Sequence, residues 1–179
     1  MLIAFNKPMN VLSQFTSEGG WPGLTDFIDM PNVYAAGRLD RDSEGLLLLT
    51  DDGKLQARIT APRAKVPKTY LAQVEGTPTN AALDALRRGV DLKDGTTRPA
   101  RVASIRSPEL WPRDPPVRTR KTVPDAWLRV TITEGKNRQI RRMCAAVELP
   151  CLRLVRTRIG DWELGDLAPG EWRRVDGVS

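Results

Sequence analysis

Four consecutive leucines, Leu46 to Leu49, form the segment that most restricts how this chain can fold. A continuous apolar run of this length, closed by the turn Asp51-Asp52-Gly53, is typical of a buried strand. The run follows directly after the densest charge in the chain, Arg38 to Glu44, which holds three carboxylates and two arginines in seven residues. The sequence therefore predicts a rigid strand that carries a highly charged loop at its amino-terminal end.

Elsewhere the hydrophobic spacing predicts short strands and short helices that are interleaved along the chain. The strands are expected over residues 33–36, 68–76 and 127–133. The helices are expected around residues 24–28, 55–59 and 80–88, and in a segment that begins soon after Gly135 and carries Ile140, Met143, Cys144 and Val147 at i, i+3, i+4 and i+7. The order has neither a regular βαβ period nor a glycine-rich phosphate-binding motif. It favours an α+β fold with a mixed, mainly antiparallel sheet and flanking short helices.

The length of 179 residues suits one domain over residues 1–179, with room for two lobes. The segment Met1 to Pro8 lacks the basic start and the apolar run of a signal peptide, and no later stretch approaches the ~20 apolar residues of a membrane span. The sequence also lacks a long apolar stripe that would be left exposed. We therefore expect a soluble, cytoplasmic and monomeric protein with no membrane partner.

Positive charge is concentrated in one region of the sequence. Residues 98–158 hold 15 Lys and Arg against 5 Asp and Glu, a balance of +10, and since the whole chain carries +6, the remainder carries −4. A regional basic patch points to a polyanion as partner, and a solvated basic face is the alternative.

A proline-rich segment within this region, residues 108–124, has five prolines and four basic residues and predicts an extended, exposed loop. The segment is either a plain surface loop or a loop that binds a phosphate backbone. The residues that could make such contacts are Trp111, Arg113, Arg118, Arg120 and Lys121.

The sequence contains no histidine, which removes the commonest general base near neutral pH and the commonest metal ligand. Its two cysteines, Cys144 and Cys151, lack a CxxC spacing and cannot complete a zinc site by themselves. Ser-His-Asp, Cys-His and histidine-metal chemistry are therefore excluded. Any catalysis must use carboxylates, lysine, tyrosine, arginine or backbone groups.

The charged loop from Gly37 to Gly45 holds the best candidates for a catalytic carboxylate, Asp40, Asp42 and Glu44. A buried strand gives this loop a rigid base, which a site needs to hold its side chains in place. Spacing alone does not choose among the three acids. Leu39 can tuck into the core and hold Asp40 near the base of the loop, whereas Asp42 and Glu44 suit turn formation and capping. A purely structural role for Asp40 stays open at this point.

Four segments, in order, resemble the motifs of the pseudouridine synthases that modify small-subunit and large-subunit ribosomal RNA. They are FNKPMNVLSQFT at residues 5–16, GRLDRDSEGLLLLTDDG at 37–53, KTYLAQVEG at 68–76, and EGKNRQIRRM followed by LRLVRTRIG between Glu134 and Gly160. Together they extend over nearly the whole chain. The resemblance implies the catalytic fold of that family with its active-site cleft on the sheet. The separate N-terminal RNA-binding domain that members often carry is not expected here, because the NKP motif starts at Asn6.

The resemblance also implies a reaction. A uridine of large-subunit (23S) ribosomal RNA is flipped into the site, its N1–C1′ bond is broken, and the uracil is rejoined through C5, with no cofactor or metal. On this basis Asp40 is the nucleophile or base, Arg141 is its ion-pair partner, and Tyr70 stacks on the target uracil. The residues expected to contact RNA are Arg38, Lys68, Arg138, Arg142, Arg113, Arg118, Arg120 and Lys121.

Two other functions fit the sequence less well. A non-catalytic RNA-binding protein would use the same basic surface and would not need Asp40. A glycoside or nucleoside hydrolase would use two of Asp40, Asp42 and Glu44 as an acid and nucleophile pair, which requires their carboxyl groups at a defined separation.

Overall fold

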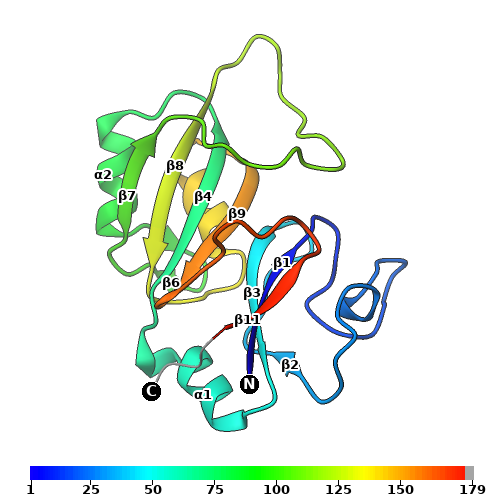
Figure 1. Cartoon of the computed structure of the whole chain (residues 1–179). Coiled ribbons are helices and arrows are strands. Elements are labelled where there is room, and N and C mark those ends of the chain that lie inside the picture. The colour runs from blue at the N-terminus through cyan, green and yellow to red at the C-terminus, as the bar shows by residue number, and fades with distance from the viewer. Residues whose placement is uncertain (176–179) are drawn as a thin grey trace. The chain divides into compact units, whose positions relative to one another are not determined.

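The computed structural model describes residues 1–175, and the chain forms two compact units (Figure 1). Unit 1 comprises Met1–Val66 and Val155–Ser179, and unit 2 comprises Pro67–Leu154. The predicted domain over residues 1–179 ends in four residues that lie outside the described part. Among the helices of residues 1–175, none has the length and apolar character needed to cross a membrane.

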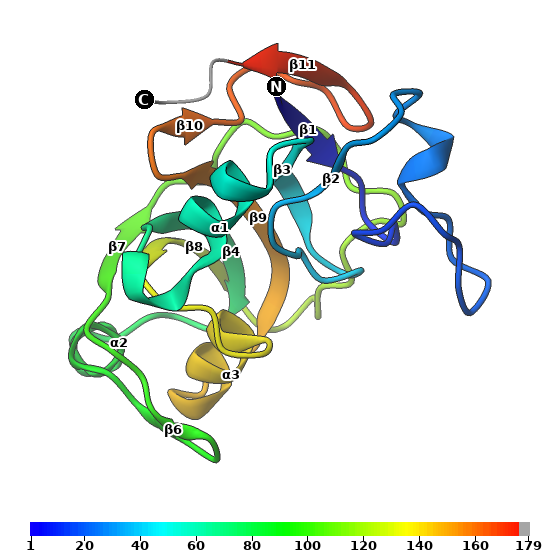
Figure 2. The same cartoon turned by 90° about the horizontal axis from the view of Figure 1, so that it is seen from below.

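The sheet of unit 1 is built around β3 (Glu44–Thr50), in which all seven residues are buried. β3 pairs antiparallel with β1 (Leu2–Lys7), which is also buried throughout, and β1 pairs antiparallel with β11 (Trp172–Val175), as Figure 2 shows from below. β3 also pairs in parallel with β9 (Cys151–Ile159) at residues 44 and 45. Two short strands, β2 (Tyr34–Ala35) and β10 (Trp162–Glu163), pair antiparallel with β3 and β9.

Local chemistry explains the helix that follows β3. The Asp52 carboxylate accepts hydrogen bonds from the backbone N–H groups of Lys54 and Leu55 and so caps α1 (Gly53–Thr60). The helix buries Leu55 and Ile59 and packs beside β3. The other helical turns of unit 1 are the 3-10 helices η1 (Leu24–Asp26) and η2 (Pro62–Ala64).

The sheet of unit 2 is antiparallel. β4 (Lys68–Glu75) pairs with β8 (Asp125–Ile132) along its whole length, with Lys68 opposite Ile132 and Glu75 opposite Asp125. β8 pairs in turn with β7 (Arg101–Ile105). The alternating burial along β4 matches the period of two expected for a strand with one face on the core.

Two helices and a short hairpin complete unit 2. α2 (Asn80–Arg88) lies beside β7 and is capped by the Thr79 hydroxyl, which accepts a hydrogen bond from the Ala82 N–H at 3.1 Å. α3 (Gln139–Ala146) buries Ile140, Met143 and Cys144. The hairpin pairs β5 (Asp91–Leu92) with β6 (Gly95–Thr96).

The predicted α+β class and the mainly antiparallel mixed sheet are confirmed, and the predicted strands are present with shifts of at most two residues at their ends. One helix differs from expectation, because the segment around residues 24–28 forms only the 3-10 helix η1. α3 begins at Gln139, four residues after Gly135, and residues 136–138 before it form a turn that ends with Arg138 in the left-handed conformation at φ +49°.

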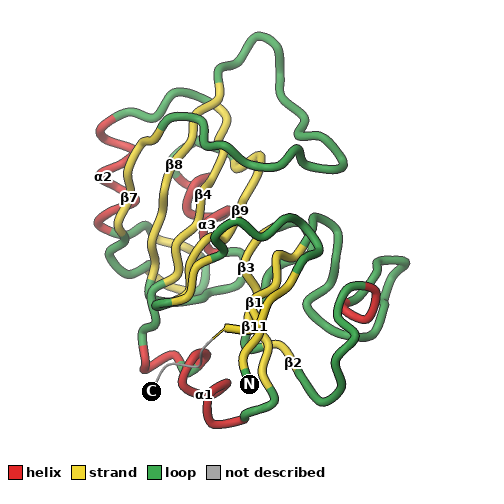
Figure 3. The backbone as a smooth tube through the Cα atoms, in the orientation of Figure 1, coloured by secondary structure: helices red, strands yellow, loops and turns green. Residues whose placement is uncertain are grey.

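Figure 3 shows that the chain between β7 and β8, which contains the proline-rich segment, is a long loop. None of its residues 106–124 is buried, as the composition predicted. The chain between β1 and β2 is also mostly loop, interrupted by η1. These two loops contain the longest irregular stretches in the described part of their units.

Replacement of Gly45 by alanine is expected to destabilise the protein by about 3 kcal/mol. Gly45 has φ +107°, and a Cβ added there would lie 2.2 Å from the carbonyl oxygen of Arg156 on the paired strand. Gly53→Ala is the matched control, because Gly53 starts α1 and an added Cβ would meet only the Tyr34 hydroxyl at 3.5 Å. Urea unfolding measures both variants. Equal stability of the two variants would contradict the close approach at Gly45.

Candidate active site

Asp40 lies half-buried in the loop that joins β2 to β3 in unit 1. The preceding residue, Leu39, is buried as predicted, and the buried Ser13 fixes its backbone twice. The Ser13 hydroxyl accepts a hydrogen bond from the Leu39 N–H at 3.0 Å and donates one to the Leu39 carbonyl at 2.6 Å. The Asp40 carbonyl accepts a hydrogen bond from the Ser43 N–H at 3.0 Å, which closes a turn. The backbone on the N-terminal side of Asp40 is therefore held in one position.

On the C-terminal side of Asp40, the backbone of Arg41 is held by Lys7 and Asn10. Lys7 is fully buried at the end of β1, and its Nζ donates a hydrogen bond to the Arg41 carbonyl at 3.2 Å. The Asn10 N–H donates to the same carbonyl at 2.8 Å, and Arg41 Nη1 donates to Asn10 Oδ1 at 2.5 Å. The two other acceptors of Lys7 Nζ are the carbonyls of Pro8 at 2.8 Å and Val11 at 2.7 Å.

A buried arginine, Arg156 of β9, anchors the start of the same loop within unit 1. Its Nε donates to the Leu46 carbonyl at 2.8 Å, and its Nη1 donates to the Arg38 carbonyl at 3.3 Å. The backbone is thus tied to the core at residues 38, 39 and 41, on both sides of Asp40. Such a loop can hold a carboxylate in one geometry, which is what a nucleophile or base needs.

Burial lowers the pKa of Lys7 to about 7 from its ordinary value, and the carboxylates of Glu44 and Asp42 oppose the change. Both acids therefore act on the Lys7 amino group more strongly than Asp40 does. Glu44 is itself buried as the first residue of β3. The interpretation of Asp42 and Glu44 as acids that shape the loop stays a prediction.

Tyr70 and Lys68 lie on β4 of unit 2. Tyr70 is buried opposite Val130, and Lys68 is half-buried at the start of the strand. The Nζ of Lys68 is 3.9 Å from where a Cβ on Gly135 would lie, so the KTY strand and the EGKNR segment lie close together inside this unit.

Arg141 also belongs to unit 2, where it lies half-exposed in α3 directly after the buried Ile140, as predicted. Asp40 belongs to unit 1. The expected ion pair between Arg141 and Asp40, and the stacking of Tyr70 on a uracil held at Asp40, stay predictions.

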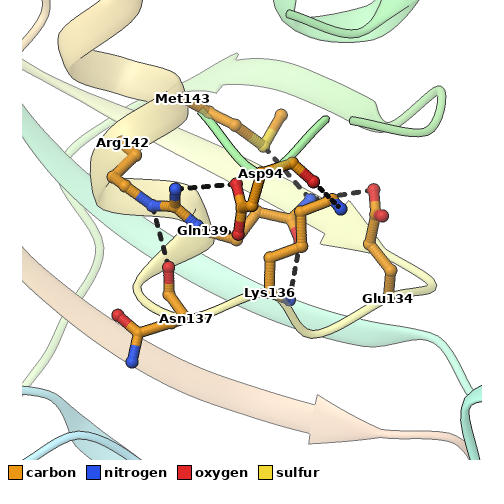
Figure 4. Close-up of polar contacts among 7 residues, drawn as sticks. All are labelled: Asp94, Glu134, Lys136, Asn137, Gln139, Arg142 and Met143. Atoms are coloured by element: carbon orange, nitrogen blue, oxygen red, sulfur yellow. Dashed lines mark hydrogen bonds and ion pairs between the residues drawn. The ribbon is translucent and has the colours of Figure 1, made fainter. Parts of the chain in front are cut away.

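A buried amide shapes the EGKNRQIRRM segment, as Figure 4 shows. The side chain of Gln139 is 3% exposed, and its Oε1 accepts a hydrogen bond from the Lys136 N–H at 3.0 Å. Its Nε2 donates to Glu134 Oε2 at 3.0 Å and contacts the Met143 sulfur at 3.5 Å. Gln139 therefore fixes the turn that precedes α3 and sets where the helix begins.

Arg142, the residue after Arg141, is held by contacts inside unit 2. Arg142 forms a two-pronged pair with Asp94, at 2.8 Å and 3.0 Å, and its Nε donates to the Asn137 carbonyl at 2.8 Å (Figure 4). The hydrogen bond from Arg142 holds the pKa of the Asp94 carboxyl below its ordinary value. If Arg142 contacts RNA as predicted, its guanidinium must do so while it is already paired with the carboxylate of Asp94.

The other residues predicted to contact RNA differ in their surroundings. Arg113 donates from all three side-chain nitrogens to the carbonyls of Pro115, Leu152 and Pro116, and Arg120 pairs with Glu75, so both fasten the proline-rich loop to unit 2. Four further arginine and lysine residues are exposed and suit contact with a phosphate. They are Arg38, Arg118, Lys121 and Arg138.

The sequence interpretation missed the residues that position the loop, Lys7, Ser13 and Asn10. A lysine at the end of the apolar strand LIAFNK was the available signal, because a buried lysine must find acceptors. In residues 1–175 no group of three or more histidine, cysteine, aspartate or glutamate side chains could hold a metal ion.

Comparison with known proteins gives the family. Residues 1–146 match the family model described as RNA pseudouridylate synthase. The chain is 62% identical over 179 residues to the ribosomal large subunit pseudouridine synthase E of Xanthomonas campestris pv. campestris, and the match covers 98% of this chain and 96% of the relative. The chain belongs to the RNA pseudouridylate synthase family.

Within that family several relatives with more than half of their residues identical to this chain carry the same name. A second relative, from Vibrio vulnificus, carries the same name and is 59% identical over 97% of this chain and 74% of its own length. The proline-rich segment and the ending GEWRRV resemble this type E as well. A solved structure titled pseudouridylate synthase superposes with a TM-score of 0.79 at 31% identity, over 98% of this chain and 70% of that one. The family resemblance of the four motifs is confirmed.

Titration of Lys7 is expected near pH 7, far below the ~10.4 of a free lysine. Between about pH 7 and 10 the unfolded chain holds this proton and the folded chain does not. The free energy of unfolding therefore rises with pH, and this group contributes at most ~1.4 kcal/mol per pH unit. Below pH 7 both states are protonated and the contribution is constant. NMR of the Lys7 side chain, assigned with Lys7→Arg, measures the pKa directly. A midpoint above pH 9.5 would contradict the expectation.

Replacement of Gln139 by alanine is expected to cost about 2 kcal/mol of the free energy of unfolding, because buried partners lose their hydrogen bonds. Asp94→Ala is the matched comparison. It removes a pair whose side chains are 32% and 46% exposed, and such exposed pairs contribute less to stability than a buried, hydrogen-bonded amide. Urea unfolding of both variants tests the order. A larger loss for Asp94→Ala would show that the exposed pair, and not the buried amide, holds this segment.

Proposed function

We propose that this protein isomerises a specific uridine of large-subunit (23S) ribosomal RNA to pseudouridine, with Asp40 as the nucleophile or base. The observation that carries the proposal is the anchored loop: Ser13 fixes the residue before Asp40, and Lys7 and Asn10 fix the residue after it. The names of the relatives support ribosomal RNA as the substrate class. An rRNA substrate would place the enzyme in the cytoplasm, and the expected monomer stays part of the proposal.

We further propose roles for two residues of unit 2. Arg141 pairs with Asp40 and helps to hold its carboxylate in the position that a nucleophile or base requires. Tyr70 stacks on the uracil, an interaction of the kind that proteins use for flipped bases. The half-exposed position of Arg141 at the edge of the buried face of α3 is compatible with an ion pair. The exposed cations Arg38, Arg118, Lys121 and Arg138 supply charge for phosphate contacts.

The reaction leaves a direct signal. Formation of the C5–C1′ bond replaces the hydrogen on C5, so tritium placed there is released into water. With large-subunit rRNA transcribed from tritiated precursors, Asp40→Asn is expected to reduce release more than ~10³-fold, equivalent to about 4 kcal/mol in the barrier. Circular dichroism confirms that the variant folds.

Asp42→Asn is the matched control, since Asp42 lies in the same loop and is expected to keep release within about threefold. Release that survives Asp40→Asn would refute the role of Asp40. Absence of release by the unmodified protein, from naked rRNA and from ribosomal precursor particles alike, would favour a non-catalytic RNA-binding protein. Production of free uracil would favour hydrolysis.

A further inference from the structure

An exposed tryptophan lies beside the loop that carries Asp40. Trp21 is 38% exposed, and the exposed large apolar side chains of residues 1–175 are otherwise only Met1 and Tyr34. Water contact of a large aromatic ring is unfavourable and calls for an explanation when the ring is held in place.

The backbone around Trp21 is fixed by a tight turn in the sequence EGGW. Trp21 and Glu18 exchange backbone hydrogen bonds at 3.0 Å and 3.3 Å, and Gly19 and Gly20 between them have φ values of +61° and +83°. Positive φ at both central residues is typical of a type I′ turn, which a Gly-Gly pair adopts without strain.

Two further backbone hydrogen bonds close the base of the loop that carries Trp21. The Leu12 N–H donates to the Pro22 carbonyl at 2.9 Å, and the Leu24 N–H donates to the Gln14 carbonyl at 2.7 Å. Trp21 therefore stands on an ordered hairpin and not on a loose loop, so its ring is positioned before any ligand arrives.

Arg41 joins this ring to the loop of Asp40. Its guanidinium carbon lies 4.2 Å from the centroid of the Trp21 ring, within the range of a cation–π contact, and its Nη1 is fixed by Asn10. Arg41 is also the residue next to Asp40 in the sequence. The ring and the cation thus form a single unit, the Trp21–Arg41 platform, whose arginine directly follows Asp40 in the loop.

The turn that precedes Trp21 is open at Gly20. A Cβ added to Gly20 would meet no atom within 4 Å outside its chain neighbours, and one added to Gly19 would meet the Trp21 ring at 3.7 Å. The two central residues of the turn therefore have no side chains that could cover the ring.

We propose that the Trp21–Arg41 platform binds an unpaired nucleobase that neighbours the target uridine in the RNA. The inference rests on the proposed function, because it takes RNA at Asp40 as given. Stacking of one base on an aromatic side chain tolerates any base, and the arginine adds attraction for the adjoining phosphate. The platform holds the strand after its target base has left the stack.

Kinetics with the tritiated large-subunit rRNA tests the platform. Trp21→Ala is expected to raise KM at least fivefold, while Trp21→Phe, which keeps an aromatic face, stays within threefold of the unmodified protein. Tyr34→Ala is the matched control: Tyr34 is the other exposed aromatic of unit 1, and it pairs with Thr50 at the opposite end of β3 from the loop. It is expected to change KM by less than twofold.

A binding experiment separates stacking from charge and does not depend on turnover. Fluorescence anisotropy compares a single-stranded RNA of twelve nucleotides with an abasic backbone of the same length and charge. Trp21→Ala is expected to weaken binding of the RNA at least fivefold and binding of the abasic strand less than twofold. An RNA affinity within twofold of the unmodified protein, or equal losses on both strands, would overturn the inference. If the unmodified protein releases no tritium, the proposed function fails, and the anisotropy result still decides whether the platform binds a base.

Discussion

The arrangement of the site depends on the hydrogen bonds that the amino group of Lys7 donates. A lysine that is fully buried must have acceptors for its N–H groups, and here three backbone carbonyls supply them, one from the Asp40 loop and two from the segment after β1. The bond to the Arg41 carbonyl joins β1 to the loop that β3 carries. The acceptors are backbone carbonyls and not side chains, so these hydrogen bonds fix the shape of the loop. The negative charges of Asp42 and Glu44 act on the Lys7 amino group separately, through electrostatic attraction.

This arrangement explains why dense charge lies against a run of four leucines. β3 is buried in full, so the loop at its start has a base that cannot move without opening the core. Gly45 lets the backbone of β9 approach closely enough for Arg156 to reach the carbonyls of Arg38 and Leu46. The buried charges near the loop are thus joined to peptide dipoles, which limits the cost of removing them from water.

Sequence reasoning predicted the elements whose causes are local. β3, β4 and α2 follow from an apolar run, a period of two, and a Thr79 cap with a terminal glycine, and all three appear close to the predicted residues. The turn between Gly135 and α3 was not predicted, because it depends on the side chain of Gln139, which holds Lys136, and on Arg138, which enters the left-handed region. Lys7, Ser13 and Asn10 escaped prediction for a related reason, since their partners lie 26 or more residues away, at Leu39 and Arg41.

Contacts between residues far apart in the sequence also change what the regional positive charge means for RNA binding. Counting residues gives 15 basic side chains between positions 98 and 158, yet Arg120 and Arg142 already have a carboxylate, and Arg113, Arg153 and Arg156 donate to carbonyls within the protein. A cation that is neutralised by a carboxylate gains little from a phosphate and displaces few counterions from RNA. Affinity for RNA must then depend on fewer cations than the sequence suggests, and a non-ionic contact such as base stacking has correspondingly more weight in holding the substrate.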